Sequence, residues 1–210
     1  MGSLGIMSVV LTFFVQTNGP LYGEVGVTHW IRDNTPGVVD LIAGLIDPAL
    51  TDVAAPLVFI AIAFMVWWRW GRYPVLLLGL AGAFTGLTRV GDLVHRPRPT
   101  AAVEWSSYSV GSGGYPSGHA VFAVLVLGTI AVLSRRYSTP RASKVIVASM
   151  KLLIALTLWS RVSRLEHWPL DVVGGGLMAT VGLVGIIWLH PRLRVFALAR
   201  PHLRHLLRLD

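Results

Sequence analysis

The chain has 210 residues, of which 54% are hydrophobic and only 13% are charged, and its formal net charge is +8. Soluble domains carry about 25% charged residues, so this composition favours an integral membrane protein, and the length fits one domain covering residues 1–210. The chain has no cysteine, which excludes a disulfide framework and a thiolate nucleophile. The positive charge does not indicate nucleic-acid binding, because most basic residues flank apolar segments, as topology determinants do.

Six apolar segments are predicted to be membrane helices. In chain order they cover Leu4–Gln16, Ala54–Trp70, Pro74–Val94, His119–Ser134, Val145–Trp159 and Leu170–Leu189. The first is short, but it has neither a basic n-region nor a small-residue cleavage site, so we expect a retained helix rather than a signal peptide. Between the first two, Thr35–Val53 alternates apolar and acidic residues at helical spacing, which predicts an interfacial helix. The expected fold class is all-α, a polytopic bundle of six transmembrane helices plus this interfacial amphipathic helix.

The basic residues predict the orientation of this bundle. They cluster after the second, fourth and sixth segments, at Arg69, Arg72, Arg135, Arg136, Arg141, Lys144, Arg192, Arg194, Arg200, Arg204 and Arg208. By the positive-inside rule these connections face the cytoplasm, together with both termini. All acidic residues except Asp210, and all the polar clusters described next, fall on the other side. We therefore expect a multi-pass protein of the cell membrane whose working site is extracytoplasmic.

The sequence Pro116-Ser117-Gly118-His119 stands directly before an apolar helix, after a glycine-containing loop. A helix N-terminus offers free N–H groups and partial positive charge, so it binds phosphate readily. Gly118 lets the backbone approach a ligand closely, the Ser117 hydroxyl adds a donor, and His119 is a candidate proton donor. An ordinary serine helix cap is the alternative interpretation.

Another polar cluster lies between the fifth and the sixth apolar segment. It contains Ser160, Arg161, His167 and Asp171. Pro169 suits a first helical turn, so His167 and Asp171 lie four residues apart at a helix start, close enough to meet. A carboxylate that holds one imidazole nitrogen fixes the tautomer and leaves the other nitrogen free to attack. Asp171 alone would be a common N-terminal helix charge, and Arg161, which follows Ser160, could be a snorkelling anchor.

A further cluster, Arg96-Pro97-Arg98-Pro99, ends the third apolar segment. Planar guanidinium groups hold phosphate oxygens bidentately, whereas a solvated basic loop is the alternative interpretation. The sequence has no carboxylate cluster suited to Mg²⁺, no HExxH and no Gly-x-x-x-x-Gly-Lys loop. We therefore expect no metal and no cofactor, with the charge of a phosphoryl group met by arginines, histidine and helix N–H groups.

Together these clusters resemble the three-part signature of the type 2 phosphatidic acid phosphatase family, the integral membrane lipid phosphate phosphatases. The family pattern is Lys-x6-Arg-Pro, Pro-Ser-Gly-His and Ser-Arg-x5-His-x3-Asp. The second part is complete at Pro116–His119, and the third is complete at Ser160-Arg161, His167 and Asp171. The resemblance covers nearly the whole chain, and the combined signature is far more specific than any one part.

The first part of the signature is partial. Arg98 and the proline after it match, but the position of the family's lysine is Gly91. If Arg96 and its proline are taken instead, the lysine position holds Arg89, which keeps the positive charge. Either Arg89 or Arg96 is expected to take over the role of the lysine.

The resemblance implies a role for each matching residue. His167 is the nucleophile that forms a phosphohistidine, Asp171 orients it, and His119 protonates the leaving oxygen and later helps to activate water. Arg98, Arg161, Ser117 and the Gly118 amide hold the phosphoryl group, and no metal is required.

The expected function is therefore an outward-facing phosphatase of a lipid phosphate or pyrophosphate, with undecaprenyl pyrophosphate as the first candidate substrate. Phosphatidylglycerol phosphate, phosphatidic acid or another polyprenyl phosphate is the alternative within this class. An alternative of another class is a lipid-phosphate binding or transport protein without turnover, which Gly91 favours. A vanadate haloperoxidase shares the pocket by resemblance, but such enzymes are soluble. No nucleic acid partner is expected, and the sequence leaves the oligomeric state open.

Overall fold

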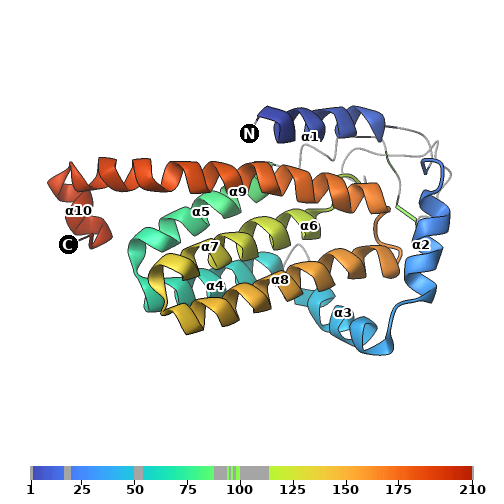
Figure 1. Ribbon diagram of the computed structural model, residues 1–210, viewed down its shortest axis with the longest axis horizontal. Coiled ribbons are helices and arrows are strands. Elements are labelled where there is room, and N and C mark those ends of the chain that lie inside the picture. Colours follow the sequence, from blue (N-terminus) through green and yellow to red (C-terminus); the bar gives the residue numbers. More distant parts are fainter. Residues whose placement is uncertain are drawn as a thin grey trace.

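The computed structural model describes residues 2–16, 20–49, 54–87, 94, 96, 98–99 and 114–209. All regular elements in this part of the chain are helices (Figure 1). They are α1 (Gly2–Phe14), α2 (Glu24–Asp33), α3 (Gly37–Ala49), α4 (Ala54–Trp70), α5 (Arg72–Leu87), α6 (Gly118–Phe122), the π-helical turn η3 (Ala123–Leu127), α7 (Gly128–Tyr137), α8 (Pro140–Ser163), α9 (Pro169–Leu198) and α10 (Pro201–Leu207). The all-α prediction is confirmed.

The core of the bundle lies between α5, the continuous run from α6 to α7, and α9. Buried apolar side chains from these helices form one cluster, with Leu77 and Leu78 of α5, Leu125 of η3 and Ala179 of α9 among them. Helices α1, α4 and α8 pack around this centre. Large apolar side chains of α4, such as Trp68, point outward and are exposed. A helix that is apolar on all sides is typical of a protein surrounded by lipid.

Three helices are long and apolar enough to cross a membrane. They are the run Gly118–Tyr137, α8 and α9. The segments predicted as the first, second and third spans also form apolar helices, namely α1, α4 and α5, but these have 13, 17 and 16 residues. At 1.5 Å per residue the described part of α5 is about 24 Å long, less than the roughly 30 Å of a hydrocarbon core. Six spans are therefore not confirmed, and the part of the third predicted segment that follows Leu87 lies, apart from Val94, outside the described residues.

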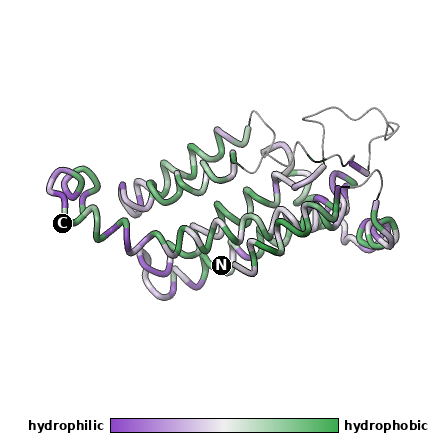
Figure 2. Tube along the Cα trace, turned by 90° about the horizontal axis from the view of Figure 1, so that it is seen from above, coloured by the Kyte–Doolittle hydropathy of each residue, from purple (hydrophilic) through white to green (hydrophobic). Residues whose placement is uncertain are grey.

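Polar residues gather at the two ends of the bundle, and the middle is apolar (Figure 2). At one end, Trp70 Nε1 donates to Ser138 Oγ at 3.1 Å, which joins the α4–α5 turn to the α7–α8 turn. The Arg72 guanidinium donates to the Leu206 carbonyl at 3.0 Å, so α10 lies at the same end. The basic connections of the sequence analysis therefore share one end. The starts of α6 and α9 and the end of α8 lie at the other (Figure 1).

Two short helices cover that second end. The segment Thr35–Val53, predicted as an interfacial helix, contains α3, which packs against α8. Helix α2, which the apolar pattern did not predict, runs across the ends of α8 and α9 (Figure 1). Its sequence, EVGVTHWIRD, mixes polar and apolar residues in a short stretch, so it gave no span signal. A location of α3 in a membrane interface stays a prediction.

Candidate active site

The first turn of α9 is shaped by local sequence. Pro169 occupies the first helical position, where its missing N–H costs nothing, and Trp168 before it is extended. Asp171, at the third position, folds back, and its Oδ2 accepts the Trp168 amide at 2.8 Å. An acidic residue is favoured here because it faces the positive end of the helix dipole. The turn therefore fixes Asp171 and places its carboxylate, which is fully buried, beside His167.

His167 belongs to the short connection between α8 and α9. The Arg161 carbonyl accepts the amides of Glu166 at 3.1 Å and His167 at 3.0 Å, which anchors this connection to the last turns of α8. The imidazole is buried, with only 3% of its surface exposed. Its Nδ1 lies 2.6 Å from the carbonyl oxygen of Gly114, and a carbonyl can only accept. Nδ1 therefore carries a proton, and in the neutral imidazole Nε2 keeps a lone pair.

The partner that fixes the tautomer is not the expected one. Nδ1 of His167 is 3.8 Å from Oδ2 of Asp171, which is close enough for charge interaction but too long for a hydrogen bond. Asp171 Oδ2 already accepts the Trp168 amide, and Oδ1 faces Arg96. The Gly114 carbonyl takes the hydrogen bond that the sequence assigned to the carboxylate.

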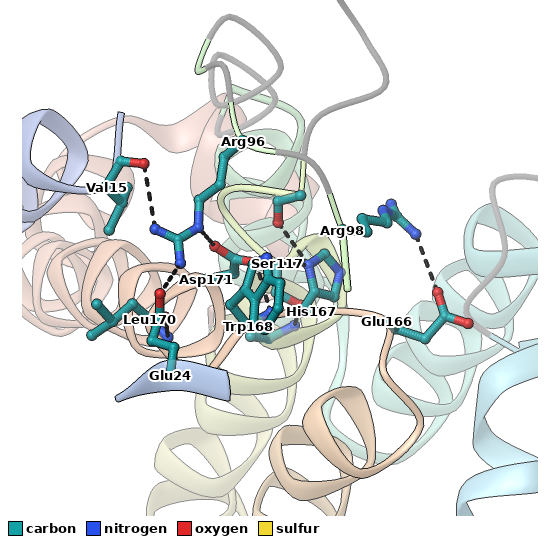
Figure 3. A network of polar contacts seen from close by, with 12 residues as sticks. Val15, Glu24, Arg96, Arg98, Ser117, Glu166, His167, Trp168, Leu170 and Asp171 are labelled. Atoms are coloured by element: carbon teal, nitrogen blue, oxygen red, sulfur yellow. Dashed lines mark hydrogen bonds and ion pairs between the residues drawn. The ribbon is translucent and has the colours of Figure 1, made fainter. Parts of the chain in front are cut away.

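Arg96 lies in the interior rather than at an open phosphate site (Figure 3). Its side chain is fully buried, and each guanidinium nitrogen contacts an oxygen of the protein. Nε lies 2.7 Å from Asp171 Oδ1, Nη2 pairs with Glu24 Oε2, and Nη1 donates to the Val15 carbonyl at 3.3 Å. These contacts differ from the phosphate contact expected of Arg96, because two buried carboxylates already compensate its charge.

Arg98 occupies a different environment two residues later. Its side chain is 43% exposed, and its Nη1 donates to Glu166 Oε2 at 3.3 Å across the rim of the site. Arg161, near the end of α8, is 3% exposed. Arg98 is therefore an exposed arginine next to Glu166, whereas Arg161 is a buried arginine of the helix that leads to His167. Arg89 and Gly91, the two candidate positions for the lysine of the signature, lie outside the described residues.

The start of α6 docks directly on the start of α9. The Ser117 amide donates to the Asp171 carbonyl at 3.1 Å, and its hydroxyl accepts the Ala120 amide at 3.4 Å as a helix cap. The capping interpretation of Ser117 therefore holds, and the cap uses its hydroxyl oxygen only as an acceptor. Gly118 is exposed and His119 is half-buried at this helix start. Close packing requires Gly175, where a Cβ would lie 2.8 Å from the Ser117 carbonyl.

The three clusters of the sequence thus meet at one end of the bundle. Gly114 joins them, since its carbonyl accepts from His167 and its amide donates to the Arg96 carbonyl at 2.7 Å. Within the described residues, no group of three or more His, Asp or Glu side chains is arranged to hold a metal ion. What the arrangement offers is a buried imidazole held at Nδ1, the guanidinium groups of Arg98 and Arg161, and a helix N-terminus.

Comparison with known proteins assigns the family. Residues 70–194 match the model of the PAP2 superfamily. The chain belongs to the PAP2 superfamily. This confirms the resemblance found in the sequence, and the match includes the described residues of all three clusters.

The fold of this PAP2 protein is also that of a solved membrane protein. It is similar to the crystal structure of the first transmembrane PAP2 type phosphatidylglycerolphosphate phosphatase from Bacillus subtilis, with a TM-score of 0.71 and 20% sequence identity. The similarity covers 90% of this chain and 95% of that one. No curated protein matches the sequence. At this identity the likeness establishes the fold of the bundle.

Two residues of this PAP2 site were missed by the sequence analysis. Gly114 had a weak signal, since it closes the glycine-containing loop before Pro116, but nothing local shows that its carbonyl meets His167. Glu24 had none, because a glutamate at the start of a short helix is an ordinary N-terminal charge. Only its burial, at 5% exposed, and its pairing with Arg96 distinguish it.

Proposed function

We propose that this PAP2 protein is a membrane lipid phosphatase that transfers the phosphoryl group of its substrate to His167. The observation that carries the proposal is the hydrogen bond from His167 Nδ1 to the Gly114 carbonyl at 2.6 Å. In the neutral ring this bond leaves Nε2 unprotonated and on the side away from that carbonyl, as a nucleophile requires. The guanidinium groups nearby suit a dianionic phosphate, and the apolar helices suit a substrate that stays in the membrane.

The proposed reaction has two steps. In the first, Nε2 of His167 bonds to phosphorus while the bond from phosphorus to the lipid oxygen breaks, and His119 gives that oxygen a proton. In the second, His119 removes a proton from water, the water oxygen bonds to phosphorus, and the electron pair of the P–N bond returns to Nε2. Arg98, Arg161, the Ser117 hydroxyl and the Gly118 amide hold the phosphoryl oxygens, whose charge grows in the transition state. We propose that no metal is needed.

The preferred substrate is undecaprenyl pyrophosphate, hydrolysed to undecaprenyl phosphate on the extracytoplasmic face of the cell membrane. Orientation is supported by the basic residues, which lie at the end of the bundle opposite His167 and so predict a cytoplasmic location for that end. Both termini are proposed to be cytoplasmic, and residues 1–210 to act as one domain. Phosphatidylglycerol phosphate is the second candidate, because the similar solved structure is a phosphatidylglycerolphosphate phosphatase.

Phosphate release from purified protein tests this proposal. A panel of undecaprenyl pyrophosphate, phosphatidylglycerol phosphate and phosphatidic acid should rank the substrates, in the presence of EDTA. His167→Ala is the matched inactive control. Saturable lipid binding without phosphate release from any member would favour the alternative of a binding or transport protein. Activity abolished by EDTA and restored only by Mg²⁺ would contradict the metal-independent mechanism.

A further inference from the structure

Glu24 joins three parts of the chain that are far apart in sequence. It is the first residue of α2, and its carboxylate is almost completely buried. Oε2 accepts the Leu21 amide at 2.8 Å and pairs with Arg96, and Oε1 accepts the Leu170 amide at 3.2 Å. The carboxylate therefore ties α2 to Arg96 and to the first turn of α9, the turn that also carries Asp171.

Arg96 continues this connection toward the nucleophile. Its Nε lies 2.7 Å from Asp171 Oδ1, and the other oxygen of Asp171 lies 3.8 Å from His167 Nδ1 (Figure 3). The side chains of Glu24, Arg96 and Asp171 are at most 6% exposed. Glu24, Arg96 and Asp171 thus form a buried row of three charged groups that ends at the imidazole of His167, and we call these four residues the Glu24 relay. In such a row each charge depends on its neighbours, because water does not compensate it.

We propose that Glu24 and Arg96 are positioning residues for His167. They hold Asp171 and the start of α9 in place, and they give the row a net charge of −1 next to the imidazole. This inference rests on the proposed function, in which His167 attacks phosphorus. Neither residue contacts the phosphate in this scheme, so the proposal gives Arg96 a role different from that of the lysine it was expected to replace.

The chemistry explains why the net charge matters. When Nε2 bonds to phosphorus, Nδ1 keeps its proton, so the ring gains positive charge in the transition state. A fixed negative charge nearby stabilises that ring, and it acts strongly because the site is buried. Without the charge of Glu24, Arg96 and Asp171 form a neutral pair, and this stabilisation is lost. The loss falls on the attack step and not on binding, since the phosphate touches neither carboxylate.

Glu24→Gln is the direct test, because glutamine has nearly the same shape but no charge. With dioctanoyl phosphatidic acid as the probe, we expect kcat to fall about 10- to 100-fold, while KM changes less than about threefold. The loss is below the roughly 10²–10³ of a donor that contacts the transition state directly, because Glu24 acts through Arg96 and Asp171. Rapid-quench measurement of phosphoenzyme formation should show the same loss. Glu24→Asp, which keeps the charge, should recover part of the rate. Asp40→Asn, an exposed carboxylate on α3 that pairs with Arg164, is the matched control and should leave both constants unchanged.

A double-mutant cycle separates the relay from a loss of folding. Arg96→Gln alone leaves two buried carboxylates facing each other, so it should be more damaging than Glu24→Gln. In the Arg96→Gln background, Glu24→Gln should cause no further loss and should restore some activity, because it removes that repulsion. Rates are expressed per folded protein, quantified from the monodisperse fraction in size-exclusion chromatography, so that an unfolded fraction does not count.

The possible outcomes distinguish a failure of the Glu24 relay from a failure of the proposed function. Additive losses, a change in KM alone, or wild-type kcat in Glu24→Gln would overturn the relay while leaving the proposed function intact, provided that His167→Ala is inactive. A wild-type protein that releases no phosphate from the probe or from the lipid panel, and forms no phosphoenzyme, would overturn both.

Discussion

Substituting Gly174 by alanine should disturb His167, the proposed nucleophile, without a direct contact between the new methyl group and the imidazole. Gly174 lies on α9 one turn after the first, and a Cβ built there would be 2.6 Å from Cζ of Tyr115. Tyr115 is fully buried and shares a hydrogen bond of 3.0 Å with the Thr12 hydroxyl, so the ring has little room to move. Restoring ordinary van der Waals contact requires a shift of about 1 Å. Tyr115 follows Gly114 directly, so the shift is transmitted to the carbonyl that holds His167.

The magnitudes follow from this geometry. Overpacking of a buried site typically costs about 1–3 kcal/mol, so we expect Gly174→Ala to lower the free energy of unfolding by that amount. A displacement of about 1 Å at a catalytic group typically costs about 10²-fold in rate, so kcat should fall to this extent. The hydrogen bond between the Gly114 carbonyl and Nδ1 is 2.6 Å long, and it cannot lengthen by 1 Å and still fix the tautomer.

Gly176→Ala on the same helix is the matched control. A Cβ at Gly176 would meet no heavy atom within 4 Å, so the same substitution should leave kcat unchanged. It should also keep or slightly raise stability, by up to about 1 kcal/mol, because alanine is the better helix former. Thermal unfolding in detergent and steady-state phosphate release measure the two effects. If Gly174→Ala and Gly176→Ala behave alike in both assays, the connection from Tyr115 through Gly114 to His167 is wrong.

Three further outcomes are expected. His119→Ala should still form an acid-labile phosphoenzyme from a substrate with a good leaving group, whereas His167→Ala should form none; in a rapid-quench experiment the opposite pattern would exchange the two roles. Glu166→Gln should lower KM by a factor of about 2–5 at low salt and by less at high salt, because Glu166 competes with the phosphate for the exposed side chain of Arg98. An unchanged KM would show that Arg98 is not part of the binding site. Since the chain has no cysteine, a single cysteine at Ser138 in the α7–α8 turn should be labelled in intact cells only by membrane-permeant reagents, and labelling by an impermeant maleimide would reverse the proposed orientation.

Much of the fold could be predicted because its signals are local. Apolar composition predicted α4 at its observed bounds, and it predicted α8 and α9 apart from their ends. The ends differ because caps are polar: α8 begins at Pro140, where the Thr139 hydroxyl accepts the Ala142 amide at 3.4 Å, five residues before the apolar pattern starts.

The candidate site likewise combines relations that the local sequence predicts with contacts that only the tertiary structure decides. Local spacing placed His167 and Asp171 on one helical turn and Ser117 at a helix start, because such relations depend only on helix geometry. The partners of these side chains were decided by tertiary structure. Gly114 is 53 residues from His167, and Glu24 is 72 residues from Arg96. A buried charge needs a partner, and a buried imidazole N–H needs an acceptor, but the tertiary packing decides which residue supplies it. No pattern in the neighbouring sequence could therefore have identified the contact of His167 with Gly114 or that of Arg96 with Glu24.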